Sequence, residues 1–348
     1  MDIRRFVIKT LLFASPLFLL IAVYGVLDVF KVLRYHDPYY VNGRPMGVVL
    51  NAGHVATMIF DHNRGEQKYD SFIFGSSRSR TYEVADWKRH IGAEASCFHF
   101  DGNAEPLYGV WCKVKYIDRC GVNINNALFV VDGLLLSELT SRTGHLYRIP
   151  PMVEENGSYV GYHSTFIKSF LHPEFLVAYF DYLISGEVKP YMTTDFLLSG
   201  QYRTHEMLTN EARHEHRDSL IAIGQYYTPE VMALFENRQC PDSVAPIVVG
   251  EVQRAMLQDI ADVFKRHNTC YRVVVSPLYD QIKMNPEDVK ALGEIFGAEN
   301  VYDFSGVSEF TSDYRNYYDD SHYRPNVARE VLNIAYGKKQ ETLQDIDE

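Results

Sequence analysis

The stretch FIFGSSRSR at residues 72–80 ends an apolar run with two serines. A serine hydroxyl is a poor nucleophile unless a base takes its proton and a third group orients that base. Without those partners, Gly75-Ser76-Ser77 fits an ordinary polar turn or an anion-binding loop. The chemistry of this stretch therefore depends on what the rest of the chain supplies.

A base and its orienting group occur together near the C-terminus, in YYDDSHYRP. Asp319 precedes His322 by three residues, so on one turn its carboxylate can fold back onto the ring of its own histidine. That contact would hold the tautomer and stabilise the imidazolium. Asp320 would point away in an extended turn. The pattern predicts a triad of Ser77, His322 and Asp319.

Short apolar runs alternate with helical patterns along the chain, which indicates an α/β fold. Continuous apolar strands separated by helices are typical of a parallel sheet covered on both faces. We therefore expect an open, doubly wound, flavodoxin-like sheet, whose functional sites lie at the carboxyl ends of its strands. Ser77 follows the first strand. The five predicted strands are DSFIFG, ASCFHF, ALFVVDG, YRVVVSP and NVYDFSG.

The alternation lapses between about residues 134 and 245. HPEFLVAYFDYLISG has a helical pattern, but the flanking segments are irregular and rich in aromatic residues. We interpret this segment as a mostly helical insertion or lid over the sheet.

The N-terminal region has the composition of a membrane anchor. No charge occurs between Lys9 and Asp28, a span close to the roughly 20 residues that a bilayer requires. Arg4 and further basic residues precede it, which favours a cytoplasmic N-terminus, and no good cleavage site follows it. We expect residues 1–34 to form a cytoplasmic stub and a single transmembrane anchor of the inner (cytoplasmic) membrane. Residues 35–348 would form the α/β domain on the periplasmic or extracellular side.

The net charge and the cysteine content indicate which partners and which disulfide are not expected in this chain. The 348 residues carry a formal charge of -11, which argues against nucleic acid as the main partner. Five cysteines are an odd number, so at least one lacks an intrachain partner. Cys112 and Cys120 are eight helical residues apart, about 12 Å, which is too far for a disulfide.

Three histidines in THEMLTNEARHEHRD resemble a zinc site: His205, His214 and His216. On a helix, however, His214 and His216 would point to different faces. We therefore expect no metal, and the sequence suggests no other cofactor.

In motif order and placement, the chain resembles the SGNH/GDSL hydrolase superfamily. It is most similar to the membrane-anchored branch that includes the teichoic acid D-alanyl transfer protein and the alginate O-acetyltransferases. The resemblance rests on FGSS after the first strand, on FDGNAEPLYG as a second block, and on DDSH with its D-x-x-H spacing. It covers residues 69–335 apart from the insertion.

The resemblance implies roles for individual residues. Ser77 matches the nucleophile, Asp319 and His322 match the D-x-x-H pair, and the amide of Gly102 matches the oxyanion donor of the second block. The third block usually supplies an oxyanion-binding asparagine, whereas FVVDGLLL has Asp132, a poor donor when ionised. Asn103 is the candidate substitute.

Arg78 and Arg80 fit equally a solvated helix start and a contact with an anionic donor or polymer. The function expected from these features is a membrane-anchored acyltransferase or esterase acting on an extracytoplasmic glycan or cell-envelope polymer. A membrane-bound acyl-donor protein would be a further partner. The alternative is a catalytically inactive scaffold or glycan-binding protein of polysaccharide assembly, which the missing third-block asparagine favours.

Overall fold

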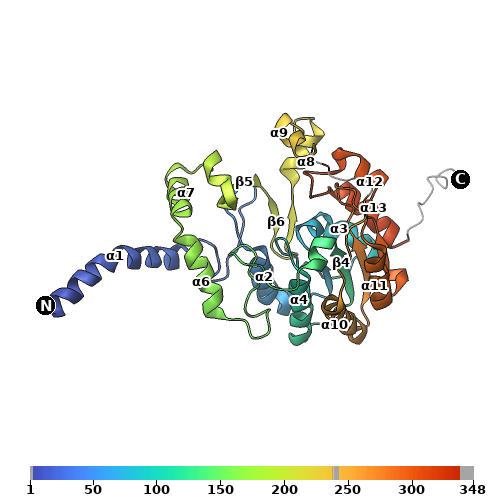
Figure 1. The fold of residues 1–348 in the computed structure, drawn as a ribbon, viewed down its shortest axis with the longest axis horizontal. Coiled ribbons are helices and arrows are strands. Elements are labelled where there is room, and N and C mark those ends of the chain that lie inside the picture. Colours follow the sequence, from blue (N-terminus) through green and yellow to red (C-terminus); the bar gives the residue numbers. More distant parts are fainter. Residues whose placement is uncertain (1–2, 237, 239–242, 338–348) are drawn as a thin grey trace.

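A five-stranded parallel sheet forms the centre of the molecule (Figure 1). The computed structural model describes residues 3–236, 238 and 243–337. The strand order is β3-β2-β4-β8-β9, and every pairing is parallel. The α/β class and the parallel sheet expected from the sequence are confirmed. The strands are β2 (Ser71–Phe74), β3 (Cys97–His99), β4 (Asn126–Val131), β8 (Cys270–Val275) and β9 (Val301–Asp303).

Helices cover both faces of this sheet, which explains why its strands are apolar throughout. Alternate strand residues point to opposite faces, so Phe72 and Phe74 pack on one side and Ile73 on the other. The first face is covered by α2 (Ala52–Gln67), α4 (Leu107–Arg119), α10 (Glu251–His267) and α11 (Pro286–Phe296). The second is covered by α3 (Val84–Ile91) and α13 (Pro325–Ala335).

The order of the strands changes direction at β2. β2 pairs with β3 on one side and with β4 on the other, so the chain passes from β2 to β3 and then crosses back over β2 to β4. Ligands of open parallel sheets bind where the connections diverge, outside the carboxyl ends of the strands. Ser77 follows β2 and Asp132 follows β4 at this end of the sheet.

The predicted insertion contains both helices and short strands. Its strand β5 (Leu198–Tyr202) pairs antiparallel with β1 (Pro45–Val48), which ties the insertion to the segment before the sheet. β6 (Thr204–Glu206) and β7 (Glu211–Arg213) form a second antiparallel pair. Its longer helices are α6 (Tyr159–Phe170), α7 (Pro173–Ser185) and α8 (Glu215–Ala222), followed by the short α9 (Pro229–Ala233).

The N-terminal helix α1 (Ile3–Leu27) projects from the rest of the molecule (Figure 1). It has 25 residues, and an 18-residue window within it has a mean hydropathy of 2.3. None of the residues in that window is buried against the rest of the molecule. This length and composition fit a membrane anchor and also a signal sequence.

The cysteines in the described part of the chain are free thiols: Cys97, Cys112, Cys120 and Cys270. The prediction that Cys112 and Cys120 do not form a bridge is therefore confirmed. Cys240 lies outside the described residues.

Candidate active site

The turn after β2 presents Ser77 at the carboxyl end of the sheet. Gly75 has φ 154°, and a Cβ atom there would lie 2.8 Å from the carbonyl oxygen of Val130 and 2.9 Å from Cβ of Ser79. Only glycine allows the turn to pass so close to β4. Ser77 is the first residue of a short 3-10 helix that ends at Thr81. The N–H groups at the start of such a helix have no intrahelical partner.

The structure brings Ser77, His322 and Asp319 together. The hydroxyl oxygen of Ser77 lies 2.8 Å from Nε2 of His322. Nδ1 of the same ring lies 2.8 Å from Oδ1 of Asp319. That carboxylate oxygen also accepts the backbone N–H groups of Ser321 at 3.0 Å and His322 at 2.9 Å. The D-x-x-H turn therefore fixes the aspartate and its histidine as one unit.

Asp319 is held in its ionised form by these contacts. Burial disfavours its charge, but hydrogen bonding to His322 and the charge of that ring outweigh burial and lower the pKa of Asp319. Burial and the neighbouring charge of Asp319 instead raise the pKa of Asp320. An ionised Asp319 orients the imidazole and stabilises its protonated form.

The three residues line a cavity of about 580 Å³. This volume lies in the range of small-molecule sites. Polar side chains suited to sugar hydroxyls surround the triad, including Asn103, Tyr147, Ser199 and Gln201. β5 and the segment up to α8 supply part of this wall, so the second half of the insertion lines the site.

Three arginines also face this cavity: Arg80, Arg203 and Arg217. The guanidinium of Arg80 is neutralised by Asp101 and donates to Oδ1 of Asn103 at 3.0 Å. Arg217 approaches Asp319 only to 3.8 Å, and Arg203 lies over the ring of Tyr40 at 5.7 Å. The cavity thus holds three guanidinium groups beside the carboxyl groups of Asp319 and Asp320.

His214 lines the same wall as a neutral imidazole. Burial, together with the charges of Arg203 and Arg217, lowers its pKa well below the usual value of histidine. Sequence reasoning did not single out Arg203 or Arg217, and it considered His214 only as a metal ligand. Within the ranges described, no group of three His, Cys, Asp or Glu residues is placed to hold a metal ion.

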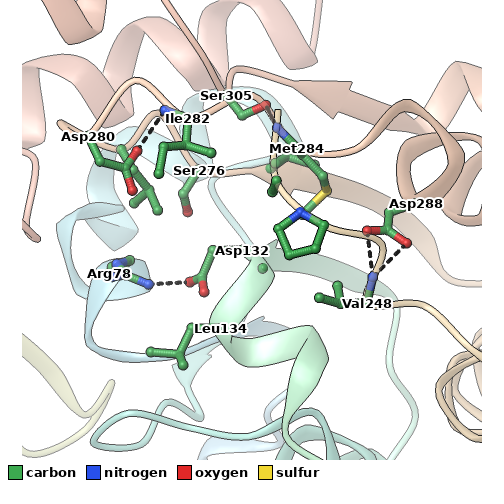
Figure 2. A pocket seen from close by; sticks show the side chains of 15 residues that line it. Arg78, Asp132, Leu134, Val248, Ser276, Asp280, Ile282, Met284, Asp288 and Ser305 are labelled. Carbon is green, nitrogen blue, oxygen red and sulfur yellow. Dashed lines mark hydrogen bonds and ion pairs between the residues drawn. The ribbon is translucent and has the colours of Figure 1, made fainter. Parts of the chain in front are cut away.

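Arg78 requires a correction, because it does not line the cavity that contains Ser77. Its Nη1 forms an ion pair with Asp132 at 2.7 Å, and its other nitrogens donate to the carbonyl and hydroxyl oxygens of Ser321. Figure 2 shows Arg78 pointing at Asp132 in a separate cavity of about 230 Å³. Arg78 therefore joins the turn after β2, the end of β4 and the histidine loop instead of meeting substrate at the triad.

The geometry separates the two predicted oxyanion donors. The N–H of Gly102 points to the carbonyl oxygen of Gly75 at 3.3 Å, and Gly102 does not line the triad cavity. Asn103 does line it, and its amide nitrogen makes only a long contact of 3.4 Å with the carbonyl oxygen of Leu50. Asn103 and the N–H of Ser77 are the better-placed donors.

Asp132 is occupied by structural contacts. Besides pairing with Arg78, its carboxylate accepts the N–H of Leu135 at 3.0 Å and begins the short helix α5 (Gly133–Ser137). It thus offers no donor where an asparagine would be expected.

We predict that Arg78→Gln lowers kcat for p-nitrophenyl acetate by about 10- to 100-fold, because a loosened histidine loop misplaces His322. Loss of the guanidinium also leaves buried Asp132 unpaired, so the melting temperature should fall. In the double variant Arg78→Gln/Asp132→Asn, which removes that charge, stability should recover more than kcat. If the melting temperature and kcat recovered to the same extent, Arg78 would have only a structural role.

Comparison with protein-family models and with curated protein sequences gave no match for this chain. The functional assignment therefore rests on the geometry of the site and on the sequence motifs. Both lead to the residues around Ser77.

Proposed function

We propose that this chain is a membrane-anchored, SGNH-like acyltransferase or esterase that acts on an extracytoplasmic glycan or cell-envelope polymer. The observation that carries the proposal is the hydrogen-bonded chain from Ser77 through His322 to Asp319, at the carboxyl end of the sheet. The strand order, read from β2 as the first strand, is the flavodoxin-like 2-1-3-4-5, which supports the SGNH-like fold.

The mechanism follows from these contacts. Nε2 of His322 takes the proton of Ser77 as its oxygen attacks an ester or thioester carbonyl. The N–H of Ser77 and the amide of Asn103 stabilise the oxyanion, and the protonated ring then gives its proton to the leaving group. A sugar hydroxyl or water, deprotonated by the same ring, attacks the acyl-serine and releases Ser77.

The N-terminal helix supports the membrane location of this chemistry. A span such as α1, whose first two turns carry Arg4, Arg5 and Lys9, would leave the N-terminus in the cytoplasm and the α/β domain on the outer side. Such anchoring favours transfer over simple hydrolysis, since a membrane-bound donor protein can deliver acyl groups to the site.

The test is labelling with a fluorophosphonate probe, which reacts with activated serines. We expect one adduct per chain, located on Ser77 by mass spectrometry. Labelling should be absent in Ser77→Ala and in His322→Ala, while the neighbouring Ser76→Ala should label normally. A folded chain that does not label at Ser77 would favour the alternative, an inactive SGNH-like scaffold or glycan-binding protein.

The buried Nε of Arg203 has no hydrogen-bond partner among the described residues. We therefore expect the guanidinium of Arg203 to bind an anionic group that one reactant carries near the reacting ester. Glucuronate should therefore inhibit p-nitrophenyl acetate hydrolysis better than glucose. Arg203→Gln should weaken inhibition by glucuronate at least about tenfold, the value of one charge-assisted contact. Arg254→Gln, an exposed change on α10, is the matched control. Equal inhibition of wild type and Arg203→Gln would contradict the anionic assignment.

A further inference from the structure

Helix α7 has an unusually apolar surface for a helix outside the core. Of its 13 residues only Glu174 and Asp181 are charged, and only Phe175, Ala178 and Tyr179 are buried. Ile184 is 87% exposed, which is the highest value for a large apolar side chain of the described chain beyond α1. Exposed apolar surface of this kind marks a contact with a partner or a membrane.

The exposed apolar residues of α7 fall on one side of the helix. Exposed Val177 and Ile184 and half-buried Phe180 recur at spacings of three and four, which places them on a common face. Exposed Leu183 extends that face, opposite the buried Ala178, whereas half-buried Leu176 packs against the cluster that includes Phe170 and Phe175. The one charge in the body of the helix, Asp181, is neutralised by Lys189 at 2.7 Å.

This helix lies at the end of α1. Tyr24 in the last turns of α1 packs on Phe170 of α6 at a ring distance of 5.4 Å. Phe30, just beyond α1, contacts Phe166 of α6 at 5.7 Å and Phe175 of α7 at 5.0 Å. Figure 1 shows α6 and α7 at the base of the projecting α1.

The length of α1 indicates at which level of a bilayer α7 would lie. Twenty-five helical residues span about 37 Å, a little more than the roughly 30 Å of a hydrocarbon core. If α1 crosses the membrane, its last turns lie at the level of the lipid headgroups, and α7 packs at that level.

We propose that α7 is a second membrane contact that lies in the interface of the lipid bilayer with its apolar face in the acyl chains. The inference rests on the membrane anchoring proposed above. Lipid is the occupant because α7 packs through Phe175 on Phe30, directly after the end of α1. The exposed apolar side chains of α1 require a lipid environment at the same place. Interfacial helices combine an apolar face with flanking polar and aromatic residues, here exposed Tyr191 shortly after α7. Two contacts would hold the triad cavity in one orientation relative to the membrane.

The test uses the full chain in nanodiscs of phosphatidylcholine and phosphatidylglycerol. The half-buried Cys120 and the exposed Cys270 are first changed to serine, together with Cys240, which lies outside the described residues. A spin label is then placed at Ile184→Cys, at Phe13→Cys within α1, or at Val307→Cys, an exposed site on the loop after β9. Power saturation compares collisions with oxygen, which concentrates in lipid, and with a nickel chelate, which stays in water.

We expect the oxygen-to-nickel ratio at position 184 to exceed that at 307 several-fold and to approach that at 13. A ratio at 184 equal to that at 307, with a lipid value at 13, would overturn the inference and leave the anchor intact. Low accessibility to both reagents at 184 would indicate a protein partner and would also overturn it. A water value at 13 would contradict the anchor itself. None of these readouts depends on catalysis, so they are independent of the labelling of Ser77.

Discussion

Replacing His322 by Ala should lower kcat/KM for p-nitrophenyl acetate by up to about a millionfold, the order seen when a serine triad loses its base. Ser77→Ala should cost about as much. The double variant should be no worse than either single variant, because nucleophile and base act as one unit. A residual rate above that of water should persist from the oxyanion donors.

This comparison distinguishes a working triad from a coincidental contact. If Ser77 and His322 acted separately, the losses in the double variant would multiply instead of remaining constant. Esterase assays with each variant, normalised by folded protein from circular dichroism, give the result directly. If the fold-loss of kcat/KM in the double variant equalled the product of the two single fold-losses, the shared mechanism would be contradicted, even with both single variants impaired.

Local sequence patterns predicted the parts of the site that short-range geometry determines. The D-x-x-H spacing was sufficient because the contact between Asp319 and His322 closes within one turn. Gly75 indicated the turn after β2, since a side chain there would collide with β4. The apolar runs predicted the five strands because strands buried on both faces need no polar residues.

The long-range ion pairs of Arg78 and Arg80 could not be predicted in this way. Arg78 and Arg80 are two residues apart in SSRSR and were interpreted together, yet a 3-10 helix turns 120° per residue and directs them to different partners. Arg78 meets Asp132 and Arg80 meets Asp101. Nothing in the local pattern identifies either partner.

Two parts of the structure were not predicted from the sequence: the cavity arginines of the insertion and helix α2. Arg203 and Arg217 come from the insertion, where irregular backbone has no periodicity to indicate which side chains face the sheet. Helix α2 was also missed, although it has a detectable pattern. Asn51 accepts the N–H of His54 as a helix cap, and Val55, Ile59 and their neighbours repeat at helical spacing on the buried side.

Asp319→Asn should reduce kcat by about 10⁴-fold while leaving the fold intact, because an amide favours the wrong tautomer of His322. Asp320→Asn should be nearly silent, since Oδ1 of Asp319, at 2.8 Å from Nδ1, is the oxygen that orients the ring. The adjacent pair is a matched comparison, as both changes remove one negative charge from the same turn.

The pH dependence gives a second readout for the same variants. The lowered pKa of Asp319 means that its charge, and the contribution it makes to folding, are present above the unfolded value and are lost as the pH falls through the folded value. The wild type should therefore lose stability in acid more steeply than Asp319→Asn. Asp320→Asn should lose it at least as steeply as the wild type, because the raised pKa of Asp320 acts with the opposite sign. If Asp320→Asn proved to be the crippling change and Asp319→Asn the mild one, the assignment of the orienting carboxylate to Asp319 would be wrong.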